Sequence, residues 1–177
     1  MRAYLAGPDV FLPNAAAHAK AKVVICARYG IEGCPPLIED VVAPEWQTIF
    51  EACVAMMETA DLIIANLTPF RGASADSGTL IEVGWFLGRG RRVFGYSNSA
   101  TPFAERSQAL LKLMADPVPG LAVEGFGLAD NLMIPGAVIA GGGHPIVLPQ
   151  DGRDRAFDAL DVFERCVALA AAALETR

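Results

Sequence analysis

Glu82 is a carboxylate in an unusual sequence setting. It stands in the stretch Leu80–Leu87, which carries no other charge, and the residues three and four positions further along are Trp85 and Phe86. A carboxylate on such an apolar helix stripe must be paired, protonated or chemically active, because burying an isolated charge costs several kcal/mol or more. The structural alternative is a capping box over Thr79–Glu82, in which the glutamate accepts a hydrogen bond from the backbone N–H of the cap residue.

A second carboxylate, Asp76, lies six residues earlier, in the loop ahead of the same helix. Its structural role there would be to favour the helix N-terminus electrostatically or to form an Asx turn. Two carboxylates at the mouth of a ligand crevice have a further use in cleaving glycosidic bonds. One acts as the nucleophile against an oxocarbenium-like centre, and a proton donor assists the leaving group. The pair Asp76 and Glu82 fits that chemistry.

Strands and helices alternate in the hydrophobic pattern. A short apolar run, Ala3–Ala6, ends at Gly7-Pro8 and predicts a buried first strand, and the continuous aliphatic run Leu62–Leu67 predicts a strand covered on both faces. A further strand is predicted at Arg92–Tyr96, whereas the Gly- and Pro-rich region 120–152 contains only a weak candidate at Leu121–Val123. Helical periodicity and capping signals predict helices over Ala15–Tyr29, Pro44–Thr59, Thr79–Arg89, Pro102–Met114 and Arg153–Leu174.

This alternation predicts an α/β fold with a flavodoxin-like doubly wound sheet, mostly parallel and of about five strands, with helices on both faces. We expect a single domain over residues 1–177. In such sheets ligands bind outside the carboxyl ends of the strands, at the point where the strand order reverses. The site is therefore expected at the loops 7–14 and 68–78 and at the helix that follows them.

The composition excludes several classes of function. The chain has 14 Lys and Arg against 20 Asp and Glu, a net charge of −6, so it lacks the basic surface that nucleic acid binding requires. Apolar residues make up 53% of it, yet no apolar run approaches the roughly 18 residues that span a bilayer. The segment Met1–Leu12 is too short for a signal peptide. We expect a cytoplasmic protein with neither nucleic acid nor a membrane as partner.

The cysteines and histidines do not indicate a metal centre. They are Cys26, Cys34, Cys53, Cys166, His18 and His144, with no C-x-x-C spacing and with the histidines far apart. We expect buried thiols, no metal site and no cofactor.

Both carboxylates belong to a longer series of motifs. In chain order these are Tyr4-Leu5-Ala6-Gly7-Pro8 with Phe11, Ala60–Gly72, Asp76-Ser77-Gly78-Thr79 with Glu82 and Gly84, and Val123–Leu128 with Asn131-Leu132-Met133. The series resembles the nucleoside 2-deoxyribosyltransferase family over most of residues 2 to 135. The resemblance implies an enzyme that exchanges the base of 2-deoxyribonucleosides for a free nucleobase. It implies retention of configuration through a covalent deoxyribosyl–glutamate intermediate.

The resemblance also implies roles for individual residues. Glu82 would be the nucleophile, Asp76 would hydrogen-bond the base and move its proton, and Tyr4 would orient Glu82 through its hydroxyl. Gly7, Phe11, Ser77 and Gly78 would contact the substrate, with Phe11 covering the base. For Tyr4 and Phe11 the structural alternative is ordinary core packing.

Asn131 and Met133 match family positions that reach the substrate from a neighbouring subunit, with Asn131 on the sugar 5-hydroxyl. The resemblance therefore implies a homo-oligomer, a tetramer or a hexamer, with the apolar segment Asn131–Ala140 in its interface. The structural alternative is that Asn131 caps a short helix and that Met133 lies in the core.

The chain also departs from the family pattern. Cys53 stands where relatives often have an amide or a carboxylate, and Leu80-Ile81 replaces a small-then-aromatic pair. The stretch Pro36–Asp40 corresponds to a loop that helps to read the base, through Glu39 or Asp40. The segment Ala137–Gln150 has no counterpart, and its glycine-rich part Gly141–His144 lacks the lysine of a phosphate-binding loop.

Two other functions compete with base exchange. A related N-glycosidase hydrolyses deoxynucleoside 5-monophosphates with the same glutamate, but tends to have a serine at the position of Asp76. A non-catalytic nucleoside-binding module on the same scaffold would keep the crevice and lose the chemistry. The presence of Tyr4, Asp76, Glu82 and Asn131 together favours the transferase.

Overall fold

The computed structural model describes residues 1–37, 45–114 and 118–175 and contains a four-stranded parallel sheet. The strands are β1 (Arg2–Tyr4), β2 (Glu32–Cys34), β3 (Leu62–Asn66) and β4 (Arg92–Tyr96), in the order β2-β1-β3-β4. Beyond β4, Tyr96 and Val147 form an isolated parallel bridge. The predicted flavodoxin-like order is thus confirmed, with a single bridge where a fifth strand was expected.

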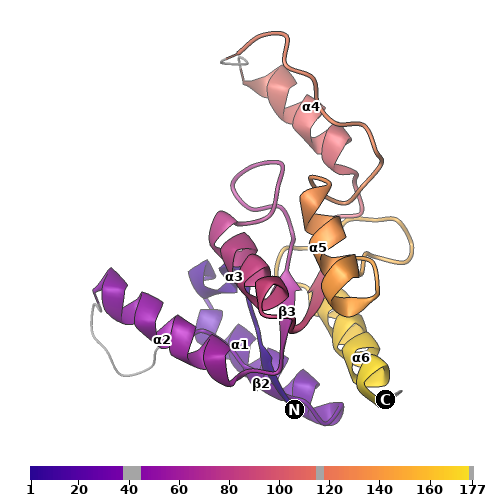
Figure 1. Ribbon diagram of the computed structural model, residues 1–177. Helices are drawn as coiled ribbons and strands as arrows, with labels where there is room; N and C mark the ends of the chain where they lie inside the picture. Colours follow the sequence, from indigo (N-terminus) through magenta and orange to yellow (C-terminus); the bar gives the residue numbers. More distant parts are fainter. Residues whose placement is uncertain (38–44, 115–117, 176–177) are drawn as a thin grey trace.

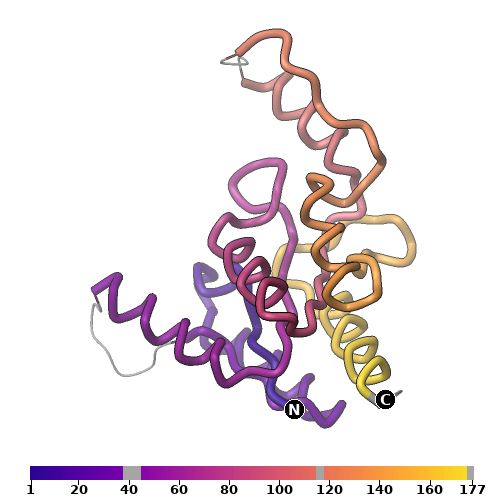
Figure 2. The backbone as a smooth tube through the Cα atoms, in the orientation of Figure 1, coloured from indigo at the N-terminus to yellow at the C-terminus, as the bar shows by residue number. Residues whose placement is uncertain are grey.

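Helices cover both faces of this sheet. The first face carries α1 (Ala15–Arg28) and α6 (Asp161–Glu175), and the second carries α2 (Trp46–Thr59), α3 (Ser77–Gly88) and α5 (Met133–Gly142), as Figure 1 shows. A further helix, α4 (Phe103–Leu113), projects away from the sheet, and the backbone tube in Figure 2 follows it outward. The predicted doubly wound α/β architecture is confirmed.

The central strand β3 explains why the two layers form. Its residues are all buried, and they alternate between the layers. Leu62 and Ile64 pack in the core with α1 and α6, whereas Ile63 and Ala65 pack in the core with α2, α3 and α5. Burying a large aliphatic side chain contributes roughly 1.5–3 kcal/mol, so an aliphatic run of this kind stabilises both cores at once.

The glycine-rich segment before His144 is part of a helix. The chain from Met133 to Gly142 forms α5, which packs on β4, and a Cβ atom at Gly142 would lie 2.1 Å from the carbonyl oxygen of Val93. Glycine therefore permits a close approach of helix to strand. The weak strand candidate Leu121–Val123 was wrong, because those residues lie in irregular structure.

The last helix begins later than its periodicity predicted. α6 starts at Asp161 rather than at Arg153. The preceding backbone is engaged elsewhere, since the side-chain amide of Asn98 donates to the carbonyls of Ala156, Phe157 and Ala159 at 2.9–3.1 Å. These tertiary hydrogen bonds hold residues 153–160 as a loop against the end of β4.

The other helix boundaries lie close to the predictions. α3 begins at Ser77, two residues earlier than expected, because Asp76 rather than Thr79 is its N-cap. Pro44, the predicted first residue of α2, lies outside the described residues, and so does the part of the predicted base-reading loop from Ile38 to Asp40. Of the helices in the described ranges, none combines the length and the apolarity that crossing a bilayer requires.

Replacing Gly142 with Ala is expected to destabilise the protein, because the new Cβ would overlap the backbone of β4. We expect the free energy of unfolding to fall by about 1–3 kcal/mol in urea denaturation. Gly136→Ala, in the same helix but with open space around its Cα, serves as the control and should be neutral or slightly stabilising. Equal effects of the two substitutions would contradict this packing account.

Candidate active site

Tyr4 and Glu82, which are 78 residues apart in the sequence, meet between β1 and α3. The Tyr4 side chain is fully buried, and its hydroxyl donates a hydrogen bond of 2.5 Å to Oε1 of Glu82. Glu82 lies within α3 and is half-buried. Its carboxylate is thus bound by a side chain of the sheet, and the capping box over Thr79–Glu82 was wrong because Asp76 caps the helix.

The surroundings of Glu82 change its protonation. Burial raises the pKa of Glu82 to about 7; the hydrogen bond from Tyr4 opposes this shift, and the negative charge of Asp76 adds to it. Burial and the neighbouring carboxylate also raise the pKa of Tyr4 well above its usual range. Near neutral pH Tyr4 therefore remains a hydrogen-bond donor, while Glu82 exchanges between its protonated and ionised forms.

Asp76 has the structural role that its position allows. Its Oδ2 accepts hydrogen bonds from the backbone N–H of Thr79 at 2.9 Å and from the Thr79 hydroxyl at 3.1 Å. Gly78 leaves room for this carboxylate, because a Cβ there would lie 3.1 Å from Oδ2. Ser77 and Gly78 are exposed in the first turn of α3, and their contact with substrate stays a prediction.

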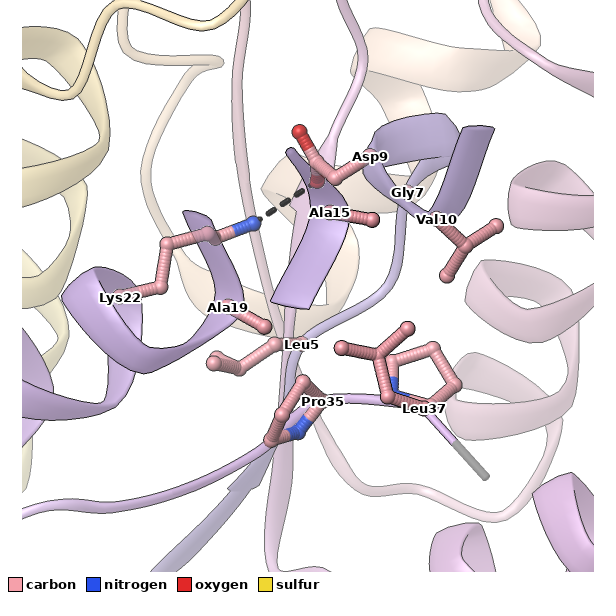
Figure 3. Close-up of a pocket in the computed structure, with 10 residues that line it drawn as sticks. Leu5, Gly7, Asp9, Val10, Ala15, Ala19, Lys22, Pro35 and Leu37 are labelled. Atoms are coloured by element: carbon pink, nitrogen blue, oxygen red, sulfur yellow. Dashed lines mark hydrogen bonds and ion pairs between the residues drawn. The ribbon is translucent and has the colours of Figure 1, made fainter. Parts of the chain in front are cut away.

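Gly7 and Asp9 shape the turn that follows β1. Gly7 has a φ of 155°, and a Cβ there would lie 2.7 Å from Cβ of Asn66 and from Oδ2 of Asp9, so this position requires glycine. The buried carboxylate of Asp9 accepts a hydrogen bond from Lys22 Nζ at 2.9 Å, as Figure 3 shows. It also accepts one from Asn66 Nδ2 at 2.9 Å and lies 3.3 Å from His18 Nε2. The turn is thereby fixed to α1 and β3.

Asp9 stays ionised although it is buried. Burial alone would raise the pKa of Asp9, but the charge of Lys22 and the hydrogen bonds from His18, Lys22 and Asn66 hold that pKa well below its usual range. The cluster borders a small, mostly apolar pocket whose lining includes Leu5, Val10, Pro35 and Leu37 (Figure 3). Sequence reasoning missed this cluster. The available signal was the spacing of His18 and Lys22, one turn apart on one predicted helix.

Phe11 lies on the surface and not in the core. Its side chain is 61% exposed, and its ring stacks on Phe70 with a centroid distance of 5.7 Å. The guanidinium of Arg71 covers both rings, 5.3 Å from Phe11 and 4.8 Å from Phe70. Core packing was therefore the wrong alternative for Phe11, whereas Tyr4 is buried in the core and also contacts Glu82.

Asn131 and Met133 lie at the start of α5. Oδ1 of Asn131 accepts from the backbone N–H of Met133 at 3.1 Å, and its Nδ2 donates to Glu124 at 3.0 Å. Asn131 thus forms a local turn ahead of α5, whose N-cap is Leu132, so the alternative that Asn131 caps this helix was wrong. Met133 is 71% exposed, so the alternative that placed it in the core was wrong. None of the hydrogen bonds in the described ranges joins Asn131 or Met133 to Glu82, and their reach into a neighbouring site stays a prediction.

Cys53 on α2 extends the Tyr4–Glu82 pair. Its half-buried thiol lies near the Tyr4 hydroxyl and Glu82, and burial raises the pKa of the thiol. Cys26 and Cys166 are buried as predicted, whereas Cys34 and Cys53 are only half-buried. Where the chain is described, no three His, Cys, Asp or Glu side chains come together in a way that could hold a metal ion.

The fold places the chain in a class, the doubly wound α/β proteins, and brings Tyr4, Asp76 and Glu82 together at the carboxyl edge of its parallel sheet. The family model "Nucleoside 2-deoxyribosyltransferase" matches residues 3–133. The chain therefore belongs to the nucleoside 2-deoxyribosyltransferase family.

Several known proteins are similar to this chain. The chain is similar to a 2-desoxiribosyltransferase from Leishmania mexicana, with 28% identity, a TM-score of 0.64 and coverage of 93% of this chain and 97% of that one. It is 28% identical over 165 residues to an uncharacterized protein of Schizosaccharomyces pombe, and this match covers 79% of this chain and 78% of the yeast protein. The 2-deoxyribosyltransferase of Bacillus psychrosaccharolyticus has 17% identity and a TM-score of 0.51, over 78% of this chain and 82% of that one, and shares the fold.

Replacing Tyr4 with Phe is expected to raise the pKa of Glu82 further, because the hydrogen bond that favours the ionised carboxylate is lost while the burial remains. A single hydrogen bond to a charged group corresponds to an upward shift of about one pH unit. The pKa is measured by 13C NMR of protein labelled at the glutamate side-chain carboxyls.

Tyr29→Phe is the matched control, because the Tyr29 hydroxyl donates to Glu164 at an exposed site on α6. That substitution should leave the Glu82 titration unchanged. An unchanged or lower Glu82 pKa in Tyr4→Phe would show that the hydroxyl does not stabilise the carboxylate.

Proposed function

We propose that this protein is a nucleoside 2-deoxyribosyltransferase that exchanges the base of 2-deoxyribonucleosides through a covalent intermediate on Glu82. The observation that supports this most strongly is the hydrogen bond between the buried Tyr4 hydroxyl and the Glu82 carboxylate. A carboxylate held in this way is oriented for attack and is only partly solvated, which strengthens it as a nucleophile. The family membership and the likeness to the Leishmania enzyme support the same activity.

The proposed reaction has two displacements. Ionised Glu82 attacks the anomeric carbon through Oε2 while Tyr4 holds Oε1; the glycosidic C–N bond breaks, and its electron pair leaves with the base. Asp76 hydrogen-bonds the departing base and relays a proton from water to its leaving nitrogen. An acceptor base then attacks the same carbon and releases the Glu82 carboxylate, and Asp76 takes up the proton that the acceptor loses. Two inversions give net retention.

The absent 2-hydroxyl of the substrate fits this chemistry. The transition state carries positive charge at the anomeric carbon, and an electron-withdrawing hydroxyl on the adjacent carbon would destabilise that charge. We therefore expect 2-deoxyribonucleosides to react and ribonucleosides to react poorly. Water that reaches the ester in the absence of a base would hydrolyse it, so slow release of free deoxyribose accompanies the transfer.

We also propose that the enzyme works as a homo-oligomer, a tetramer or a hexamer, in which Asn131 and Met133 complete the site of a neighbouring copy. Three large apolar side chains on the α3–α5 side support this, since Ile81, Met133 and Ile139 are 74%, 71% and 50% exposed. Exposed apolar surface of this kind is typical of contacts between subunits. The substrates are 2-deoxyribonucleosides and free nucleobases.

Glu82→Gln is expected to abolish base exchange while nucleoside binding persists, because the amide keeps the shape of the side chain and loses the nucleophile. The assay incubates the protein with deoxyinosine plus adenine, and separately with thymidine plus adenine, and follows new deoxyadenosine by chromatography. Activity should fall by a factor of roughly 10³ or more, and binding is measured by calorimetry with deoxyinosine.

The matched control is Glu164→Gln, on α6 and on the opposite face of the sheet. It should exchange bases like the wild-type protein. Undiminished exchange in Glu82→Gln would refute the assignment, and free base without deoxyadenosine from the wild-type protein would favour the N-glycosidase.

The rate of exchange should rise with pH through about 7, since Glu82 must be ionised to attack and its pKa lies at about 7. The measurement is kcat/KM for deoxyinosine against pH at saturating adenine. In Tyr4→Phe the midpoint of this acid limb should move to higher pH, in step with the higher pKa of Glu82. A flat profile across neutral pH would contradict a nucleophile with this pKa.

A further inference from the structure

A buried carboxylate, Asp130, holds the loop that leads to Asp76. It is only 1% exposed, and its oxygens accept hydrogen bonds from the Ser74 hydroxyl at 2.5 Å, from the backbone N–H of Ala75 at 2.9 Å and from its own neighbour, the backbone N–H of Asn131, at 2.8 Å. Ser74 and Ala75 belong to the loop between β3 and α3, whereas Asn131 precedes α5. One side chain thus joins two segments that are about 55 residues apart.

Arg106, at the base of α4, encloses the same junction. Its guanidinium lies 3.9 Å from Oδ2 of Asp130 and donates to the carbonyls of Ala73 at 2.9 Å and Ala129 at 2.7 Å, and also to that of Thr101. The planar guanidinium has five donors in a fixed arrangement, so it can hold several carbonyls at once. Both segments that Asp130 joins are therefore also tied to α4.

The residues next to this junction belong to the proposed site. Ala75 directly precedes Asp76, and Asn131 directly follows Asp130. We propose that Asp130 is a positioning residue for deoxyribosyl transfer, which sets the place of Asp76 relative to Glu82 by holding Ala75 and Asn131 on one carboxylate. The inference rests on the function proposed for Glu82 and Asp76.

An amide at position 130 could not replace the carboxylate. Asp130 accepts from three donors, two of them through Oδ1 and one through Oδ2. An asparagine keeps one acceptor oxygen and has an NH2 group in place of the other. In one orientation this NH2 group would face the Ser74 hydroxyl and the Asn131 N–H, and in the other it would face the Ala75 N–H. At least one buried donor would lose its partner, and the Arg106 guanidinium would lose its counter-charge.

The electrostatics of Glu82 provide a readout for the position of Asp76. Glu82 faces Tyr4 from β1, Cys53 from α2 and Asp76 from the start of its own helix. Tyr4 and Cys53 both have a raised pKa and are uncharged at neutral pH. Within the described part of the chain Asp76 is the neighbour whose charge raises the pKa of Glu82. If Asp76 moves away, that pKa must fall.

The test compares the Glu82 titration in the wild-type protein, Asp130→Asn and Asp61→Asn, by 13C NMR of the glutamate side-chain carboxyls. Asp61 is a matched control, because its Oδ2 also accepts from a backbone N–H, that of Arg2 at 2.8 Å, but outside the network around Asp130. The variant Asp76→Asn removes the negative charge of Asp76 and therefore gives the largest decrease of the Glu82 pKa that a displaced Asp76 could cause. We expect Asp130→Asn to lower the Glu82 pKa by roughly half a unit and Asp61→Asn to leave it unchanged.

The same variants are compared in base exchange. Asp130→Asn should lower kcat by a factor of roughly 10 to 100, the cost of misplacing a reacting group by about 1 Å, while Asp61→Asn retains the wild-type kcat. Ser74→Ala removes one donor and perturbs the fold less, so it should show the same two changes to a smaller degree and replaces Asp130→Asn if that variant does not fold.

The positioning role would be overturned if folded Asp130→Asn, or Ser74→Ala in its place, had the same Glu82 pKa and the same kcat as Asp61→Asn. Failure of the proposed function has a different signature, in which the wild-type protein exchanges no bases while the Glu82 pKa still falls in Asp130→Asn. In that case Asp130 positions Asp76, but the chemistry is not deoxyribosyl transfer.

Discussion

The hydrogen bond from the buried Tyr4 hydroxyl to Glu82 is the interaction on which this site depends. It holds a carboxylate at the boundary between the core and solvent, where burial raises its pKa to about 7. The bond favours the ionised form and the burial opposes it, so near neutral pH the carboxylate, our proposed nucleophile, is partly ionised without being fully hydrated. The donor itself cannot lose its proton in this setting, because burial and the same carboxylate raise its pKa.

The fold supports this contact through two buried carboxylates that anchor the neighbouring loops. Asp9 fixes the turn after β1 to α1 and β3, and Asp130 fixes the loop after β3 to the start of α5. Each accepts several hydrogen bonds, which compensates for the cost of burying its charge. Since β1 and β3 are neighbours in a parallel sheet, both loops lie at the same edge. The two anchored loops thus lie at the edge of the sheet where Tyr4 contacts Glu82.

The sequence was sufficient to predict the parts of the fold that local pattern determines. The aliphatic run of β3, the segment Arg92–Tyr96 and the alternation of strands and helices follow from hydrophobic periodicity and turn signals. Tyr4 and Glu82 were singled out through an apolar helix stripe and a family resemblance. The hydrogen bonds of Asp9 and Asp130 to distant segments leave no local pattern. Neither the late start of α6, which the Asn98 amide imposes, nor α5, with its unusual glycine content, could be predicted from propensity.

The covalent intermediate on Glu82 is the central claim, and mass spectrometry tests it directly. The protein is incubated with deoxyinosine without an acceptor base, quenched in acid and digested. The account predicts a peptide that contains Glu82 and is heavier by one deoxyribosyl group, absent from the Glu82→Gln variant and lost when adenine is added before quenching. Efficient base exchange with no such adduct, or with the adduct on another residue, would contradict it.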